Sequence, residues 1–298
     1  MKVASWNSGV LPSEERVGIR RDGWTRPIRA LFRNRMLMVG AVMVGALVLL
    51  AALAPVVATY SPTAVRVGPS MAPPSAAHIM GTDKLGRDLF SRIVYGSRTS
   101  LMVAIPSIIM SLVLGLILGL TSGYLGGSVD QIIMRALDIF MAFPGLLLAM
   151  AVVAILGPSI PNLLITIGLL YTPNLARVVR GPVLSVKEQE FVEAARVSGA
   201  GDWRIVWHHV LPNVTSPVIV VVTLSVAQAI LTESALAYLG LGAPPPQPSW
   251  GEMLSTSRWF LTSAPWYAVF PGLAIVFAAS GFIILGNGLR DWIDPRRR

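Results

Sequence analysis

The residues that could carry out acid–base, nucleophilic or metal chemistry are few in this sequence. The chain has no cysteine, which excludes disulfides, thiolate metal sites and a cysteine nucleophile. None of its three lysines, Lys2, Lys84 and Lys187, lies in the Gly-Lys-Ser/Thr pattern with which a P-loop ATPase reaches the β- and γ-phosphates. The histidines lie outside the long apolar segments and form no His-Glu-x-x-His zinc pattern. We therefore expect no catalytic residue, no metal site and no cofactor, and we do not expect an enzyme.

Two carboxylates, Asp138 and Glu233, stand at the ends of long apolar stretches. A carboxylate at membrane depth is costly and is typical of carriers that couple transport to an ion or a proton. A position at the membrane surface, where water screens the charge, is the simpler interpretation, and we favour it for both residues. The sequence therefore gives little support for a self-powered pump.

Residues 185–213 form the most informative polar stretch. Ser185 followed by Glu188 is a capping box, which predicts a helix that begins at Val186. Gly199 is the residue type best able to adopt the left-handed conformation that ends a helix. The sequence thus predicts a short amphipathic helix that stops at Gly199.

A second short helix is predicted over residues 203–211, with Asp202 as its cap and Pro212 at its end. A helix–glycine–helix unit can read DNA, but the first helix carries three acidic residues and no third helix is available to complete a core. We therefore expect no nucleic-acid partner. Two interpretations remain open: a structural hairpin, and a helix with a face of small residues that docks into a groove of a partner protein.

The composition shows which elements must position this hairpin. Of 298 residues, 54% are apolar and 13% are charged, with a mean hydropathy of +0.65, whereas a soluble domain carries about a quarter of its residues as charged ones. A membrane-spanning helix needs about 20 apolar residues, so the uncharged stretches predict an all-α polytopic membrane protein with six transmembrane helices. Their predicted positions are 36–59, 100–121, 138–156, 162–180, 213–235 and 266–289.

The basic residues predict the orientation. If both termini are cytoplasmic, 18 of the 24 Lys and Arg residues lie inside and six lie outside, as the positive-inside rule requires. In the second span, Gly115 and Gly119 form a Gly-x-x-x-Gly pattern, a weak indication that two helices approach closely.

These elements divide the chain into regions. We expect an N-terminal cytoplasmic tail, a first transmembrane helix, an extracytoplasmic segment, a five-helix core that contains the hairpin 185–213, and a C-terminal cytoplasmic tail: 1–35, 36–60, 61–98, 99–290 and 291–298. In the extracytoplasmic segment, Asp83 is predicted to cap a helix that lies on the membrane surface with Leu85, Leu89 and Ile93 on one side. An ordered loop is the alternative for this segment.

Several motifs carry a resemblance to a known family. Glu193-Ala194-Ala195, followed by Gly199 and by Leu211-Pro212, resembles the EAA loop of bacterial ABC importer permeases. Further segments are similar to C-type permeases of the dipeptide/oligopeptide/nickel family, in the same order along the chain: 81–101, 136–158, 233–242 and 248–254. The resemblance covers roughly residues 30–295.

The resemblance implies a type I ABC importer (MetI-like) transmembrane domain in the bacterial plasma (inner) membrane, surrounded by lipid. The implied partners are a homologous B-type permease, two ABC ATPase subunits that bind ATP, and an extracytoplasmic substrate-binding protein. A di- or oligopeptide is the expected substrate. The implied role of the hairpin is coupling to the ATPase, through Glu193, Ala194, Ala195, Gly199, Leu211 and Pro212. The family pattern often has Ile where this chain has His209.

Two other classes of function remain as alternatives. A stand-alone secondary carrier or channel predicts uptake in vesicles that lack any ATPase. A structural membrane scaffold predicts no flux under any condition.

Overall fold

The described part of the chain, residues 34–293 of a computed structural model, consists of helices joined by short connections and one long loop. The basic tails predicted at the two ends lie largely outside the described residues. Thr82 and Asp88 form an isolated β-bridge, the sole β pairing within this part of the chain. The helices are α2 (Arg35–Ala52), α3 (Ala54–Val57), α4 (Leu89–Leu125), α5 (Gly127–Met141), α6 (Gly145–Leu156), α7 (Ile160–Val186), α8 (Glu190–Val197), α9 (Asp202–Ile205), η1 (Val206–Val210), α10 (Leu211–Tyr238), α11 (Trp250–Ser257), η2 (Arg258–Phe260) and α12 (Trp266–Ile293).

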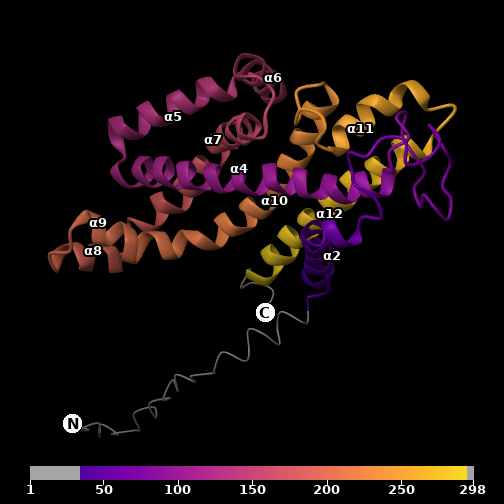
Figure 1. Ribbon diagram of the computed structural model, residues 1–298. Coiled ribbons are helices and arrows are strands. Elements are labelled where there is room, and N and C mark those ends of the chain that lie inside the picture. Colours follow the sequence, from indigo (N-terminus) through magenta and orange to yellow (C-terminus); the bar gives the residue numbers. More distant parts are fainter. Residues whose placement is uncertain (1–33, 294–298) are drawn as a thin grey trace, which may run out of the picture.

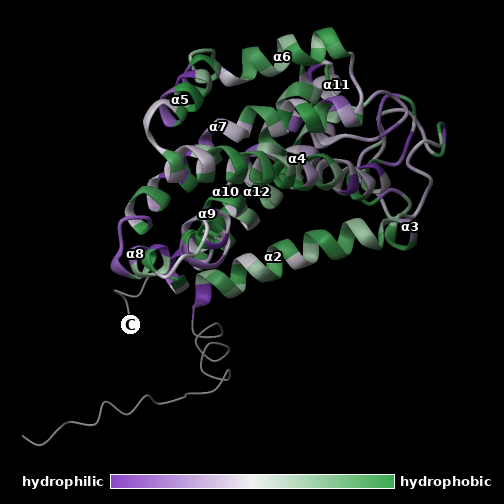
Figure 2. Cartoon of the chain, turned by 90° about the vertical axis from the view of Figure 1, so that its left-hand side faces the viewer, coloured by the Kyte–Doolittle hydropathy of each residue, from purple (hydrophilic) through white to green (hydrophobic). Residues whose placement is uncertain are grey.

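Five helices are long and apolar enough to cross a bilayer, and the pair α5 and α6 makes six if it counts as one broken span. The five are α2, α4, α7, the continuous helix Asp202–Tyr238, and α12. They form one bundle in which α2 lies along α12 and α4 lies along α7 (Figure 1). Hydrophobic residues cover most of their length (Figure 2). The predicted all-α polytopic fold is confirmed.

The third predicted span differs from its prediction. Instead of one helix over 138–156, α5 begins at Gly127 and meets α6 at an angle of 86°. The break falls at Pro144, which has an extended ψ of 121°. Proline lacks an N–H and disfavours the helical conformation in the residue before it, so a straight helix through this position is disrupted.

The predicted surface helix in segment 61–98 is wrong. Asp83 caps no helix, because its carboxylate accepts hydrogen bonds from the backbone N–H groups of Leu85 and Arg87 in a turn. The cap is Asp88, which accepts from the N–H of Ser91 at 2.8 Å. The helix that follows is α4, which runs without interruption for 37 residues.

A glycine stripe holds α4 against α7. A Cβ atom at Gly115 would lie 2.8 Å from Cβ of Leu175, one at Gly119 would lie 2.5 Å from the carbonyl oxygen of Ala176, and one at Gly123 would lie 2.8 Å from Cβ of Val183. No side chain fits in these gaps. The close approach that Gly115 and Gly119 predict is therefore confirmed, and it extends one turn further.

The two ends of the bundle carry different structures. At one end lies the hairpin formed by α8, α9 and η1; we call this the hairpin end (Figure 2). The start of α2 lies toward the same end, and the Asn34 side chain donates to the carbonyl oxygen of Gly288 near the end of α12 at 3.1 Å. The long loop 58–88 and α11 lie at the opposite end, which we call the loop end (Figure 1).

Candidate functional site

The first helix of the hairpin, α8, is shorter than predicted at its beginning. Helix α7 continues through Ser185 to Val186, so the predicted capping box at Ser185 and Glu188 is wrong. Gln189, with an extended ψ of 148°, precedes α8 instead. The capping pattern failed because the apolar face of α7 continues to Val186, which is buried against the hairpin core, and this packing favours continuation of the helix.

The end of α8 agrees with the prediction. Gly199 has φ of +82°, the left-handed conformation that glycine adopts without steric cost. The Gly199 N–H bonds to Arg196 O and the Ala200 N–H bonds to Ala195 O, both at 3.0 Å. These two bonds form a Schellman motif, which satisfies carbonyl groups that the end of a helix leaves free.

The second arm of the hairpin also differs from its prediction. Pro212 does not end a helix, because α9, η1 and α10 continue from Asp202 to Tyr238. In η1 the chain forms a π turn, in which the Leu211 N–H bonds to the Val206 carbonyl oxygen five residues back. Pro212 follows directly after this π turn, which shifts the hydrogen-bond register at the position where proline lacks an N–H.

The hairpin has a hydrophobic core of its own. Val192 of α8, Ile205 of α9 and Val210 of η1 are fully buried. They belong to a cluster shared with the ends of α7 and α10, whose buried members are Val179, Val183, Val186, Val214 and Val218. The hairpin is therefore packed on the bundle rather than tethered by flexible chain.

The predicted coupling residues divide into two groups. Glu193, Ala194, Gly199 and Pro212 are exposed, whereas Ala195 and Leu211 are half-buried and pack against the hairpin core. The exposed members leave a small-residue surface that a partner can approach. Their role in coupling stays a prediction.

Polar contacts fix the hairpin to the neighbouring end of α4. The Tyr124 hydroxyl donates to Asp202 Oδ1 at 2.6 Å, and Lys187 Nζ donates to the carbonyl oxygen of Gly123 at 2.8 Å. The hydrogen bond with Tyr124 raises the pKa of Arg196 on α8 above its ordinary value. Both arms of the hairpin are therefore held against the end of α4.

A second polar cluster joins α4, α5 and α7 beside the hairpin. The Asp130 carboxylate on α5 accepts two hydrogen bonds from the Arg180 guanidinium on α7, at 2.6 and 2.5 Å. The Ser122 hydroxyl of α4 donates to the same carboxylate. We did not predict this cluster, because its members are separated by up to 58 residues and no spacing rule relates them.

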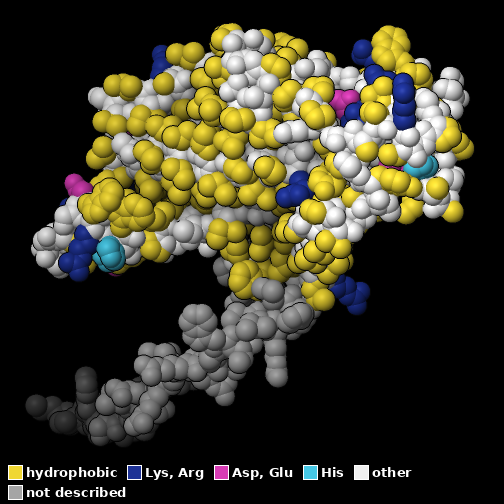
Figure 3. Space-filling model, viewed as in Figure 1, with side chains coloured by type: hydrophobic (Ala, Val, Ile, Leu, Met, Phe, Trp, Pro, Cys, Tyr) yellow, Lys and Arg dark blue, Asp and Glu magenta, His cyan; other side chains and the backbone are white. Residues whose placement is uncertain are grey.

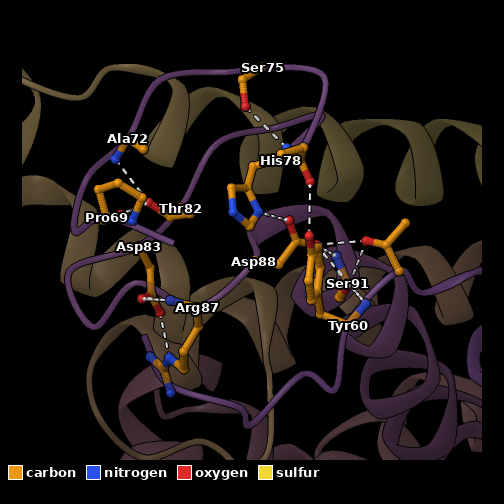
Figure 4. Close-up of polar contacts among 12 residues, drawn as sticks. Tyr60, Pro69, Ala72, Ser75, His78, Thr82, Asp83, Arg87, Asp88 and Ser91 are labelled. Carbon is orange, nitrogen blue, oxygen red and sulfur yellow. Dashed lines mark hydrogen bonds and ion pairs between the residues drawn. The ribbon is translucent and has the colours of Figure 1, made fainter. Parts of the chain in front are cut away.

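The loop end contains a buried network of charged side chains (Figure 4). His78 Nδ1 lies 2.9 Å from Asp88 Oδ1, and Arg87 Nε donates to Asp83 Oδ2 at 2.5 Å. Arg92 pairs with Glu252 of α11 at 2.9 Å. These contacts hold residues 61–88 as an ordered loop, which was the alternative for this segment, while its last residues, 89–98, form the first turns of α4.

Water does not screen Glu233, so the surface interpretation is wrong on this point. Its side chain is fully buried, and the hydroxyl groups of Ser100 and Ser249 contact its carboxylate at 3.0 and 3.2 Å. Helix α4 and the residues before α11 cover it. Asp138 is exposed and forms an ion pair with Arg177.

Comparison with known proteins shows which protein family has this sequence and fold. The family model for the binding-protein-dependent transport system inner membrane component matches residues 111–298, and the N-terminal TM domain of oligopeptide transport permease C matches residues 24–74. The chain belongs to this permease family. The family is a membrane transport component of the bacterial inner membrane and not an enzyme.

Relatives of this permease align over almost its full length. It is 44% identical over 275 residues to the dipeptide transport system permease protein DppC of Alkalihalophilus pseudofirmus, covering 92% of this chain and 90% of the relative. It is 41% identical to the glutathione transport system permease protein GsiD of Escherichia coli O6:K15:H31, covering 93% and 91%. A chain of the MetNI methionine ABC transporter has the same fold, with a TM-score of 0.56 at 18% identity, covering 67% of this chain and 94% of that one.

Proposed function

We propose that this permease is the C-type transmembrane subunit of an ATP-driven, binding-protein-dependent importer of di- or oligopeptides. Its partners are a homologous B-type permease, two ABC ATPase subunits that bind ATP, and an extracytoplasmic substrate-binding protein. The hairpin end faces the cytoplasm together with both termini. Peptide as the substrate is supported by the relatives, among them the dipeptide transport system permease protein of Alkalihalophilus pseudofirmus.

One observation carries the coupling role. The hairpin is a packed unit on the ends of α7 and α10, and its Tyr124 and Lys187 contacts attach it to α4. A force applied to the exposed side of α8 is transmitted to three long helices, because none of the connections is a flexible linker. The permease pair is then a two-state element, and nucleotide binding to the ATPases biases its inward- and outward-open populations through this contact.

Gly199 offers a test with a matched control. Gly199 and Gly157 have nearly equal φ, +82° and +84°, and neither has an atom within 4 Å of a Cβ placed on it. Substitution with an L-residue adds backbone strain on the order of 1–3 kcal/mol at both positions. The strain is at least as large at Gly157, whose ψ of 152° lies in a region that is essentially restricted to glycine. Only Gly199 lies in the hairpin; Gly157 lies between α6 and α7.

The experiment compares Gly199→Val with Gly157→Val in the complete transporter. We expect both variants to reach the membrane, and we expect Gly199→Val alone to abolish ATP-driven peptide uptake. Glu193→Lys should also abolish uptake and reduce co-purification of the ATPase subunits. Equal uptake by the two glycine variants, together with normal uptake by Glu193→Lys, would contradict the coupling role.

The buried Glu233 favours a second candidate, a stand-alone carrier that couples transport to an ion or a proton. A carboxylate within a spanning helix is a functional candidate, and within residues 34–293 this one forms hydrogen bonds with serine hydroxyl groups alone. Proteoliposomes that contain both permease subunits without the ATPases separate the two functions. Uptake driven by an ion gradient in these vesicles would support the carrier, whereas uptake that requires ATPase and ATP supports the importer.

A further inference from the structure

The exposed sides of α4 and α7 differ in chemistry. On α4 the exposed side is apolar and forms part of a largely hydrophobic surface (Figure 3); it contains Met102, Ile109, Val113 and Ile117. The first half of α7 exposes the apolar residues Ile165 and Leu169. In its second half the exposed residues repeat at three- and four-residue spacing and are small or polar: Asn174, Arg177, Gly181 and Ser185. Helix α7 also has the lowest mean hydropathy of the five long helices. Gly115 of α4 faces Leu175 of α7, so the exposed Val113 and Ile117 lie at about the level of the exposed Asn174 and Arg177. At this level the contrast is not a difference in depth.

The polar side of α7 continues onto both neighbouring helices. On one side, Arg177 forms an ion pair with Asp138 of α5, and the two side chains are 42% and 54% exposed. On the other side, the hydroxyl group of Tyr171 on α7 lies 2.9 Å from the hydroxyl group of Thr232 on α10. We define the polar face as Asp138, Asn174, Arg177 and Gln228.

Gln228 completes this face on α10. It stands one helical turn before Thr232 and is exposed, whereas its neighbours Ala227 and Ala229 are fully buried. Asn174 lies three residues after Tyr171 and three before Arg177, so it projects between the α10 side and the α5 side. Four polar side chains from three helices therefore share one surface, which lies between the hairpin end and the loop end of the bundle.

Helix α5 extends the polar face toward the hairpin end. Gln131, Arg135 and Asp138 are exposed and follow one another at four- and three-residue spacing on the same side of the helix. None of the residues of α5 is buried by the rest of the described chain.

Lipid is a poor neighbour for this surface. Charged and amide side chains on a spanning helix normally face a bundle interior or a water-filled cavity, because hydrocarbon cannot solvate them. The side chains of the Arg177–Asp138 pair remain about half exposed when all residues from 34 to 293 are in place. Water or a second protein must therefore lie against it in the membrane.

We propose that the polar face lines the water-filled translocation pathway between this chain and the partner permease. The pathway serves a hydrated, zwitterionic solute, and the half-exposed Asp138–Arg177 ion pair keeps this part of its wall hydrated. This inference rests on the proposed function, since the pathway forms only in the permease pair.

The absence of cysteine from the chain provides a direct test. Single substitutions Asn174→Cys and Gln228→Cys each introduce the only thiol of this subunit. Val113→Cys on α4 is the matched control: Val113 is 51% exposed, and the contact between Gly115 and Leu175 places it at nearly the level of Asn174. The complete transporter, with its partner subunits made free of cysteine where needed, is treated in membranes with a charged, membrane-impermeant methanethiosulfonate reagent.

We expect Asn174→Cys and Gln228→Cys to react at least tenfold faster than Val113→Cys, and we expect peptide present in excess to slow both reactions. Reaction rates equal to that of Val113→Cys in the transporter would overturn the inference. So would reaction that occurs in the isolated subunit and is lost on pairing, because the face would then be a dry contact between permeases.

ATP-driven uptake by each unmodified variant is measured in parallel. If the unmodified, cysteine-free transporter shows no ATP-driven uptake, the proposed function fails whatever the labelling rates are. If it transports peptide and the two thiols remain unreactive, only the pathway assignment fails.

Discussion

The two ion pairs between α5 and α7 have the same chemistry and different surroundings, which allows a quantitative prediction. Asp130 accepts two hydrogen bonds from Arg180 and a third from Ser122, and its side chain is 15% exposed against 31% for Arg180. Asp138 and Arg177 share one contact and are 54% and 42% exposed. The first pair is partly shielded and bidentate, whereas the second is open to water.

The coupling free energies follow from this difference. Hydrogen bonds to charged groups contribute about 1.5–3 kcal/mol to stability when they are shielded, and exposed ion pairs contribute about 0.2–1 kcal/mol. Discounting for the exposure of Arg180, we expect a coupling free energy of about 2 kcal/mol for Asp130 with Arg180. For Asp138 with Arg177 we expect less than about 0.5 kcal/mol.

The assay is a pair of double-mutant cycles. One cycle uses Asp130→Ala, Arg180→Ala and the double variant, and the other uses the same changes at Asp138 and Arg177. Equilibrium unfolding of the permease in detergent micelles, followed by tryptophan fluorescence, gives the free energy of unfolding of each variant, and the cycle isolates the pairwise contribution. Equal coupling in the two cycles, or a value below about 0.5 kcal/mol for Asp130 with Arg180, would refute the reasoning from burial.

Three further predictions concern packing and polar contacts. Gly119→Leu should destabilise the bundle by about 1–3 kcal/mol through overpacking against α7, whereas Gly181→Leu, with no atom within 4 Å of its Cβ, should be tolerated; thermal unfolding of the two purified variants compares them. Tyr124→Phe removes the hydrogen bond to Asp202 and should lower the free energy of unfolding by about 1 kcal/mol. Relative to the unaltered protein, backbone hydrogen exchange should become faster in α9 and stay the same in α11; unchanged exchange in α9 would show that Tyr124 does not anchor the hairpin. Glu233→Gln keeps the contacts with the surrounding serines and should retain the fold, while Glu233→Leu leaves three hydroxyl groups without their partner and should lower expression in the membrane; equal levels of both would show that these contacts are dispensable.

Much of the fold could be predicted from the sequence because the signals are local. Apolar stretches of about 20 residues predict spanning helices regardless of the rest of the chain, and five such helices are present. Gly199 ends its helix as predicted because the left-handed conformation is a property of that residue and its neighbours. The order of the EAA-like motif and the other similar segments predicted the family in the same way.

The same local rules failed where packing competed with them. The capping pattern at Ser185 predicted a helix start, and the buried side of α7 carried the helix past it. Asp83 was predicted to cap a helix, but its carboxylate instead pairs with Arg87 in the buried network of the loop end. Pro212 predicted a helix end, and a π turn allowed the helix to continue.

By itself, the sequence determined that this chain spans a membrane, that it carries no ATPase motif, and that a short helix ends at Gly199. Only the tertiary structure decided that Glu233 is buried, that Asp130 is held by Arg180, and that polar residues of α5, α7 and α10 share one face. The reason is separation along the chain. Hydropathy and turn propensity depend on residues within a few positions of one another. These sites instead combine residues that are 39 to 133 positions apart and meet only after the helices have packed.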